Sequence, residues 1–440
     1  MPLFARLRSS AHWLVPGALA MVLGLWGLES NGLWLDERIT MEAGTINPFM
    51  YPWEVPFFPY YLAVWIWSLG GLLEFDGWLR FSSVLAMVVG VVFTSLLGKR
   101  LGGRRLGMAA GIILALAPST NRFNQELRNY AIAVGLTAII TWAFYERFKF
   151  NRRGAQWIFG VGLFLLPFLA PYALIVVPGL LVLALFDTEL RTRLRSMLPW
   201  AIALLPGVLA QIYAALLIAH YFHDAIVVPE LTQFAEPLLW PMAYSTGPEW
   251  HVVTAGTFSV IALVLGVLTR SGLNWILALA AGAISLFAVS FLGISFWLVR
   301  AAIPLSPWLA LAAGFAVVGL PWLRYWLVLG LLAAVSLPTI AELREPGARD
   351  EDVKAAIPIV ESQYTDGDTV YVVDSETFGL NWLSWGLQRY GQANREYETG
   401  SSSTGRIWVW SKDAKGARCD ALEEWRVGAG ILQLCPKWPD

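Results

Sequence analysis

Eleven apolar segments dominate this sequence and constrain its fold more than any other feature. A helix needs about 20 apolar residues to cross a bilayer. Only 14% of the residues are charged, far below the roughly 25% of soluble domains. We therefore predict an all-α polytopic membrane protein with about 11 transmembrane helices. The segments are residues 13–28, 79–97, 107–119, 129–146, 156–169, 173–186, 198–219, 252–269, 273–293, 301–319 and 323–340.

The first segment is longer than the core of a signal peptide, and no small-residue cleavage site follows it, so we expect it to be retained as a span. If the N-terminus is cytoplasmic, fifteen Lys and Arg residues fall in inner loops and five in outer loops. This is the asymmetry of the positive-inside rule. The inner residues are Arg6, Arg8, Lys99, Arg100, Arg104, Arg105, Arg147, Lys149, Arg152, Arg153, Arg191, Arg193, Arg195, Arg270 and Arg324; the outer ones are Arg38, Arg80, Arg122, Arg128 and Arg300.

An outer loop of residues 29–78 follows the first span. Within it, the aromatic and proline-flanked stretch 57–73 is expected to lie in the membrane interface as a helix. If that stretch crossed the membrane, Lys99 to Arg105 would fall outside. Long loops are uncommon in compact cores, so the length of this one favours a functional role.

The odd number of spans places the C-terminal tail outside the cytoplasm. The chain divides into a membrane domain, residues 1–344, and a small extracytoplasmic α/β domain, residues 345–440. A helix is expected over 352–364, and strands over 369–373 and 406–410. The net charge of −1 gives no reason to expect nucleic-acid binding.

The only two cysteines, Cys419 and Cys435, both lie in the tail. In an extracytoplasmic domain such a pair is expected to form a disulfide. The alternative is two free thiols.

An acidic pair, Asp36 and Glu37, directly follows the first span. Carboxylates are costly near hydrocarbon and often mark chemistry or a polar pathway. Neighbours in a helix diverge by about 100°, so only one of the two needs to face a cavity. That carboxylate would suit a general base acting on a hydroxyl group. Alternatively, Asp36 caps a helix that begins near Arg38.

A second polar group, Asn121 to Tyr130, occupies a very short connection between apolar segments. Glu126 has Arg122 and Arg128 nearby, and an ion pair with one of them is the simplest interpretation. A functional interpretation assigns Arg128 to a phosphate, because its planar guanidinium suits phosphate oxygens. Glu126 and Tyr130 would then help to place a substrate.

Arg300 lies at the outer end of an apolar stretch. An arginine there needs either an anion or a route for its side chain to reach the interface. We expect it to bind a phosphate, with snorkelling as the alternative.

Four residues of the predicted outer loop between the seventh and eighth spans are weak candidates for a divalent metal: His220, His223, Asp224 and His251. His220 and His223 are spaced suitably on a helix, but the spacing fixes no third ligand. No cofactor is otherwise indicated, because the sequence has no phosphate-binding Gly-rich motif and no Cys-x-x-Cys.

The order of these features resembles the GT-C superfamily of integral-membrane glycosyltransferases. More closely, it resembles the bacterial branch with protein O-mannosyltransferases and the lipid A aminoarabinose transferase. The similarity is good over residues 13–150 and modest over 285–345. The matching segments are Trp34-Leu-Asp-Glu37, Pro56-Phe-Phe-Pro-Tyr-Tyr61, Leu79-Arg-Phe-Ser-Ser-Val84, Gly98 to Arg105, Ala117-Pro118, Gln125 to Tyr130, and Arg300 with Pro304.

The resemblance implies an inverting transfer of a sugar, mannose first, from a polyprenyl-phosphate donor at the outer face of the cell membrane. Asp36 would be the general base, and Glu37 its neighbour in the acidic pair. Glu126 and Arg128 would place donor or acceptor, and Arg300 would hold the lipid phosphate. The family often has His or Lys beside the proline-aromatic stretch, where this chain has Glu54.

The acceptor stays open between a protein, a lipid and a glycan. A transporter or flippase of lipid-linked saccharides is the alternative function. Transporters typically show internal repeats and charged residues at mid-membrane depth. This sequence shows no repeat and gathers its acidic residues at one face, which favours the enzyme.

Overall fold

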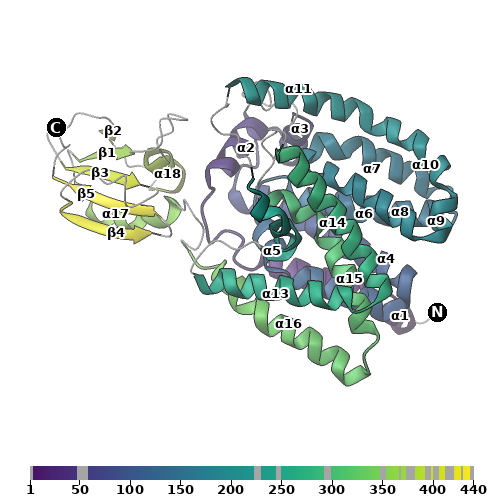
Figure 1. Ribbon diagram of the computed structural model, residues 1–440. Helices are drawn as coiled ribbons and strands as arrows, with labels where there is room; N and C mark the ends of the chain where they lie inside the picture. Colours follow the sequence, from purple (N-terminus) through teal and green to yellow (C-terminus); the bar gives the residue numbers. More distant parts are fainter. Residues whose placement is uncertain are drawn as a thin grey trace. The chain divides into compact units, whose positions relative to one another are not determined.

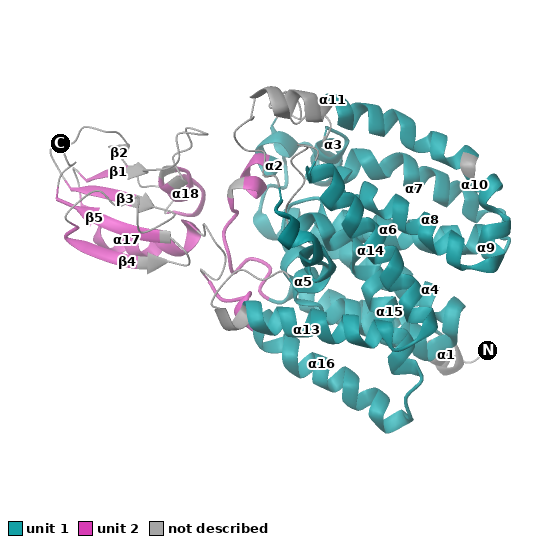
Figure 2. Cartoon of the chain, viewed as in Figure 1, with its two compact units in different colours: residues 1–26, 40–245, 249–340 teal, residues 27–39, 246–248, 341–440 magenta. Residues whose placement is uncertain are grey.

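The computed structural model describes twelve stretches of the chain, and the chain divides into two compact units (Figures 1 and 2). The first comprises residues 1–26, 40–245 and 249–340; the second comprises residues 27–39, 246–248 and 341–440. The described stretches are 3–46, 58–221, 229–243, 249–291, 299–346, 353–365, 368–372, 382–391, 398–399, 406–411, 421–427 and 430–436.

The first unit is helical. Its elements are α1 (Leu3–Leu25), α3 (Phe58–Trp67), α4 (Asp76–Leu116), α5 (Pro118–Phe123), α6 (Tyr130–Phe144), η2 (Tyr145–Lys149), α7 (Ala155–Leu169), η3 (Pro171–Ile175), α8 (Val176–Phe186), α9 (Thr188–Thr192), α10 (Leu194–Ala201), η4 (Ile202–Leu204), α11 (Leu205–Tyr221), η6 (Leu231–Leu238), α12 (Trp240–Ala243), α13 (Glu249–Val267), α14 (Arg270–Phe291), η7 (Val299–Leu305), α15 (Ser306–Val318) and α16 (Trp322–Glu342). Helix α2 (Leu35–Thr45) is shared between the two units.

All eleven predicted segments fall on these helices. Within the described residues, six helices are long and apolar enough to cross a membrane, and four shorter apolar helices accompany them. The predicted multi-pass helical fold is thereby confirmed, whereas the number of spans stays a prediction. The stretch 57–73 contains α3, whose ten residues are too few to cross a bilayer.

Two predicted spans join in the single element α4, which turns back on itself at Gly102 and Gly103. Gly103 has φ of 83°, a conformation that side chains with a Cβ avoid. The two halves then pack closely, because a Cβ on Gly98 would lie 3.0 Å from Gly107. This turn is the basic connection predicted over Lys99 to Arg105.

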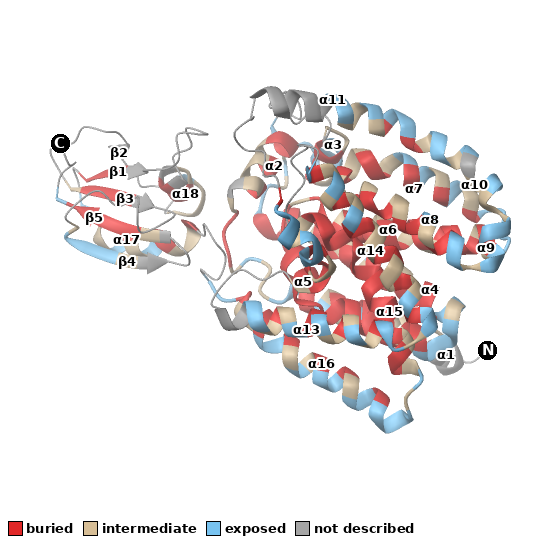
Figure 3. Ribbon diagram, viewed as in Figure 1, coloured by how far each residue is buried: buried red, intermediate tan, exposed pale blue. Residues whose placement is uncertain are grey.

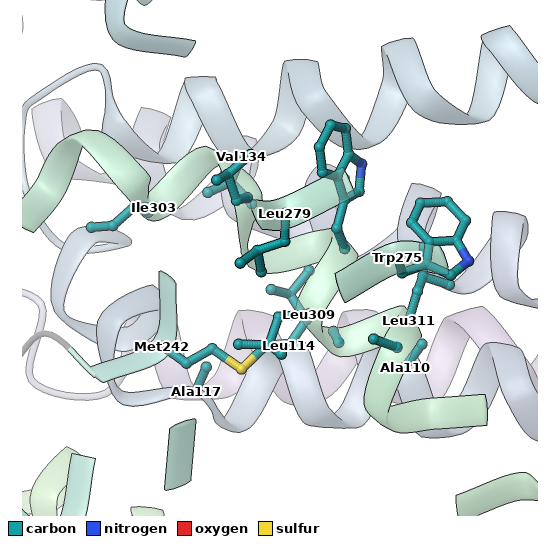
Figure 4. Close-up of a cluster of buried hydrophobic side chains, with 14 of the residues drawn as sticks. Ala110, Leu114, Ala117, Val134, Met242, Trp275, Leu279, Ile303, Leu309 and Leu311 are labelled. Atoms are coloured by element: carbon teal, nitrogen blue, oxygen red, sulfur yellow. The ribbon is translucent and has the colours of Figure 1, made fainter. Parts of the chain in front are cut away.

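The core of the first unit is apolar and centres on α6, α14 and α15 (Figures 3 and 4). Trp308 is fully buried, and its Nε1 donates a hydrogen bond to Thr141 Oγ1 at 3.0 Å. A Cβ on Gly179 would lie 2.1 Å from the Trp308 ring, so α8 can pack this closely against Trp308 only with a glycine at this position. By contrast, α16 exposes much of its surface, as a helix facing lipid does.

The helices run between two ends, which we call the polar end and the basic end. At the polar end, Asn129 Nδ2 donates to the carbonyl of Leu169 at 2.8 Å, and the Arg300 guanidinium lies 5.8 Å from the Tyr130 ring centroid. At the basic end, Arg100 pairs with Glu146, and Lys149 pairs with Asp187.

The second unit contains a five-stranded sheet of order β2-β1-β3-β5-β4. Strand β1 is parallel to β2 and β3, while β5 is antiparallel to β3 and β4. In β1–β3, Val370 pairs with Trp408; in β3–β5, Trp408 pairs with Leu434. The elements are η8 (Val353–Ala356), α17 (Ile357–Gln363), β1 (Thr369–Val372), α18 (Trp382–Tyr390), β2 (Glu398–Thr399), β3 (Ile407–Ser411), β4 (Glu423–Val427) and β5 (Gly430–Cys435).

This sheet makes the tail the predicted small α/β domain. The strands expected over 369–373 and 406–410 correspond to β1 and β3, and the helix expected over 352–364 corresponds to η8 and α17. The second unit starts at Ala341, close to the expected boundary at 345, and also takes in residues 27–39.

Candidate functional site

The acidic pair lies in the first turn of α2, which begins at Leu35 rather than near Arg38. Glu37 is fully buried, and its Oε2 accepts the backbone N–H of Trp34 at 3.3 Å. This is the reach of a third-position glutamate back to the residue that caps its helix. The alternative in which Asp36 caps a later helix is therefore wrong. Glu37 serves the helix start, whereas Asp36 is half-buried and its role as a base stays a prediction.

Residues around this pair contact the C-terminal residues of the same unit. The N–H of Leu33 donates to Tyr390 Oη at 3.0 Å, and the Arg38 guanidinium lies 4.9 Å from the Trp385 ring centroid. Lys354 Nζ donates to the carbonyl of Glu29 at 2.7 Å. Residues 27–39, which we call the acidic segment, are thus held by residues more than 300 positions away in sequence.

The polar group from Asn121 to Tyr130 is largely buried, and its amide side chains hold backbone carbonyls. Asn121 Nδ2 donates to Ala115 O at 2.7 Å. Gln125 Nε2 donates to the carbonyls of Gly24 and Trp26 at 2.8 and 2.7 Å, at the end of α1. A helix end leaves its last carbonyls without intrahelical donors, so Gln125 fixes the end of the first span.

Glu126 forms a buried ion pair with Arg122, with Oε1 at 3.1 Å from Nη2. The two side chains are 1% and 4% exposed. Nε and Nη1 of Arg122 find no hydrogen-bond partner among the described residues. The pair is the one that the simplest interpretation of the sequence predicts, and the assignment of Glu126 to a substrate stays a prediction.

Three predicted substrate-binding residues of the first unit converge on Tyr172, at the start of η3. The Tyr130 ring packs against that of Tyr172 at a tilt of 41°, with 5.5 Å between centroids, and Arg128 and Arg300 both act electrostatically on the Tyr172 hydroxyl. Arg128 also donates from Nη1 to Thr40 Oγ1 at 2.9 Å. Two guanidinium groups therefore lie at one place on the polar end.

Tyr172 itself, Asn129 and Tyr60 complete this cluster and were not predicted. Tyr172 Oη donates to Asn129 Oδ1 at 2.9 Å, and Tyr60 of α3 also lies within electrostatic range of Tyr172. The sequence signal was the Pro171-Tyr172 break between two apolar segments, which interrupts a helix at this depth. We call Tyr60, Arg128, Asn129, Tyr130, Tyr172 and Arg300 the arginine–tyrosine cluster.

An apolar cavity of about 180 Å³ adjoins this cluster. Tyr172 forms part of its wall. The other lining residues come from η3, α8, α11 and α14: Pro171, Leu174, Ile175, Pro178, Gln211, Ser285, Leu286 and Val289. The cavity thus places hydrocarbon-like surface next to two arginines.

Comparisons with known proteins agree with this arrangement. Residues 54–218 match the dolichyl-phosphate-mannose-protein mannosyltransferase family. The crystal structure of ArnT from Cupriavidus metallidurans in the apo state is similar over 98% of this chain and 100% of that one, with 13% identity and a TM-score of 0.56. The same protein bound to undecaprenyl phosphate is similar over 97% and 99%, with 14% identity and a TM-score of 0.56.

The chain has the fold of the ArnT structures, and residues 54–218 match a family of mannosyltransferases. No curated protein sequence matches it significantly.

The metal candidates remain predictions. His223 and Asp224 lie outside the described residues, and only the backbone positions of His220 in α11 and His251 in α13 are described. Within the described stretches, no group of three or more His, Cys, Asp or Glu residues is arranged to hold a metal.

The predicted disulfide lies in the C-terminal tail of the chain. Cys435, at the end of β5, is disulfide-bonded. Cys419, the only other cysteine of the sequence, lies outside the described residues.

Proposed function

We propose that this enzyme transfers a sugar, with inversion, from a polyprenyl-phosphate donor to an acceptor hydroxyl at the outer face of the membrane. The observation that carries the proposal is the arginine–tyrosine cluster beside an apolar cavity. A lipid-linked phosphate needs both features at once, because one part of it is anionic and the other is hydrocarbon.

The donor phosphate would bind Arg128 and Arg300. Cleaving the glycosyl–phosphate bond leaves negative charge on the departing phosphate oxygen, and preorganised cations stabilise such charge in the transition state. Charge-assisted hydrogen bonds from guanidinium groups are among the strongest available in a protein. Tyr130 and Tyr172 flank the arginines and supply aromatic surface and a hydroxyl group.

The first isoprene units of the donor would occupy the apolar cavity next to Tyr172. Its wall is almost entirely hydrocarbon, with Gln211 and Ser285 as the polar exceptions. That the similar ArnT structure was obtained with undecaprenyl phosphate supports a donor of this kind.

Asp36 would act as general base. As the acceptor oxygen attacks the anomeric carbon, the carboxylate takes the hydroxyl proton, the new C–O bond forms, and the bond to the phosphate oxygen breaks. One displacement inverts the anomeric centre. Asp36 is preferred over Glu37 because the Glu37 carboxylate is buried at the start of α2.

Mannose is the first donor sugar to test, because the matching family takes its name from a mannosyl donor. We also propose that the N-terminus is cytoplasmic and that the C-terminal domain and the acidic segment are extracytoplasmic. The basis is the excess of Lys and Arg in the connections at the basic end.

The proposal is tested with purified protein in nanodiscs and a panel of polyprenyl-phosphate sugars carrying mannose, arabinose, aminoarabinose or galacturonate. We expect release or transfer of one sugar, and loss of that activity in Arg300→Ala. Arg324→Ala is the matched control, because that arginine lies on the exposed face of α16. An EDTA arm reports on a divalent metal.

Donor movement between leaflets without bond cleavage would instead establish a flippase. Cleavage that persists unchanged in Arg300→Ala would remove the arginine–tyrosine cluster from the donor site.

A further inference from the structure

The stretch between α1 and α2, which contains most of the acidic segment, has little regular structure of its own. Helix α1 ends at Leu25 and α2 begins at Leu35, and only turns and bends lie between them. Contacts made elsewhere in the second unit therefore contribute to how the first turn of α2 is held.

Two of these contacts bracket Asp36, and both come from α18. Leu33, three residues before Asp36, donates its N–H to Tyr390 Oη at 3.0 Å. Arg38, two residues after it, lies with its guanidinium 4.9 Å from the Trp385 ring centroid. A hydrogen bond on one side and a cation–π contact on the other restrain both position and rotation of the first turn.

The two aromatic residues of α18 are themselves fixed. Their rings meet edge to face at 5.8 Å, and Lys354 Nζ lies 5.3 Å from the Tyr390 ring centroid. Lys354 also donates to the carbonyl of Glu29, so the residue that packs on Tyr390 holds the acidic segment at a further point. Leu33 is fully buried, which keeps water from competing for its N–H.

We propose that Tyr390 and Trp385 are positioning residues for catalysis: α18 of the C-terminal domain holds the acidic segment so that the Asp36 carboxylate is set for proton abstraction. This inference rests on the proposed role of Asp36. A catalytic group must be held to about 0.5 Å, and its supporting contacts decide whether it is. The C-terminal domain thereby acts on the chemical step.

The test uses full-length protein in nanodiscs and three variants. Tyr390→Phe removes only the acceptor for Leu33, Trp385→Ala removes the ring under Arg38, and Trp385→Phe restores a ring. Trp425→Ala is the matched control, because Trp425 stacks on Trp408 at 5.6 Å in the sheet of the same domain and not on the acidic segment. Two quantities are measured: kcat against donor KM, and hydrogen–deuterium exchange of residues 30–39.

We expect kcat to fall about fivefold in Tyr390→Phe and about tenfold in Trp385→Ala, as loss of a hydrogen bond or a desolvated cation–π contact implies. Donor KM should stay unchanged, Trp385→Phe should recover most of the rate, and exchange of residues 30–39 should accelerate in the first two variants. Trp425→Ala should lower the melting temperature of the domain but leave kcat of the folded protein unchanged.

Unchanged kcat and unchanged exchange in Tyr390→Phe and Trp385→Ala would overturn the inference. So would an equal loss of kcat in Trp425→Ala, because that result would make the effect one of general stability. Asp36→Asn separates the two proposals. If that variant is active, the role of Asp36 fails; if it is inactive while the α18 variants are normal, only the positioning role fails.

Discussion

Both ends of the helical unit collect charged residues, but the cations of the basic end stay partly exposed, whereas both partners of an ion pair at the polar end are buried. At the basic end, the buried Glu146 carboxylate accepts from Arg100 and lies 3.5 Å from Arg152. The side chains of the two arginines are 39% and 65% exposed. Lys149 pairs with Asp187 at 2.5 Å, again with the cation partly exposed. At the polar end, Arg122 and Glu126 are both almost completely buried.

This difference distinguishes charged residues that stabilise the fold from charged residues that are candidates for function. Ion pairs near solvent cost little to form and add modest stability. Buried polar groups are costly, and near a bilayer they are kept mostly where function needs them. The proposed chemistry is therefore expected at the polar end, and the basic end is expected to contribute to stability and to the orientation of the chain in the membrane.

The largest effect is expected in a test of which end of the helical unit faces the cytoplasm. Single cysteines in place of Arg104, at the exposed α4 turn, and Ser362, on the exposed face of α17, report on the basic end and the C-terminal domain. A membrane-impermeant maleimide on intact cells should label Ser362→Cys fully and Arg104→Cys only after permeabilisation. Labelling in the reverse order would contradict the topology.

The next largest effect is expected for Arg128→Ala and Arg300→Ala. Each should raise donor KM about ten- to hundredfold, as loss of a charge-assisted hydrogen bond to a phosphate implies. The affinity for the acceptor should change less. Arg324→Ala serves as the control, and equal donor KM values in all three variants would reduce Arg128 and Arg300 to interfacial anchors.

At the basic end, Glu146→Gln should affect stability and not donor binding. The variant weakens the contacts with Arg100 and Arg152 and should destabilise the protein by about 1–3 kcal/mol. Thermal unfolding in detergent measures the loss, with the exposed Glu189→Gln on α9 as control. A large rise in donor KM with no change in unfolding would reverse the assignment of the two ends.

The smallest effect concerns the ion pair of the C-terminal sheet. Burial alone would raise the pKa of the Asp368 carboxyl, but hydrogen bonds from Arg406, Thr365 and Trp408 outweigh it and lower that pKa. A lowered pKa stabilises the folded domain above the ordinary carboxyl value of about 3.9, and the stability is lost as pH falls through the folded value. Asp368→Asn should therefore cost about 1 kcal/mol at neutral pH and flatten the acid dependence of unfolding. An unchanged acid profile would show that this pair does not control the domain.

The helical fold and both charged ends could be predicted because they depend on local composition. Apolar length identifies a helix, and clustered Lys and Arg residues identify its end. The arginine–tyrosine cluster was only half predictable, since Arg128, Tyr130 and Arg300 stand out in apolar surroundings. Tyr172 does not, because an aromatic residue near a proline is common at a membrane interface.

What the sequence could not reveal depends on distant contacts or on exact register. Leu33 and Tyr390 are 357 positions apart, so nothing local indicates that residues 27–39 join the C-terminal unit. Strand β4 contains Glu423, Glu424 and Arg426, and pairing with β5 decides its conformation rather than apolar alternation. The alternative drawn from the sequence began α2 three residues too late. It therefore assigned to Asp36 the capping contact that Glu37 makes.

The most direct test of the account is Asp36→Asn, assayed separately for donor binding and for sugar transfer. Asparagine keeps the size of the side chain but cannot take the acceptor proton. We expect donor affinity to be unchanged and kcat to fall by about 10²–10⁴, the range for losing a general base. Glu37→Gln is the control: it should weaken the start of α2 and lower the melting temperature, with a smaller loss of kcat. Turnover of Asp36→Asn close to the unmodified enzyme, with donor binding intact, would contradict the account.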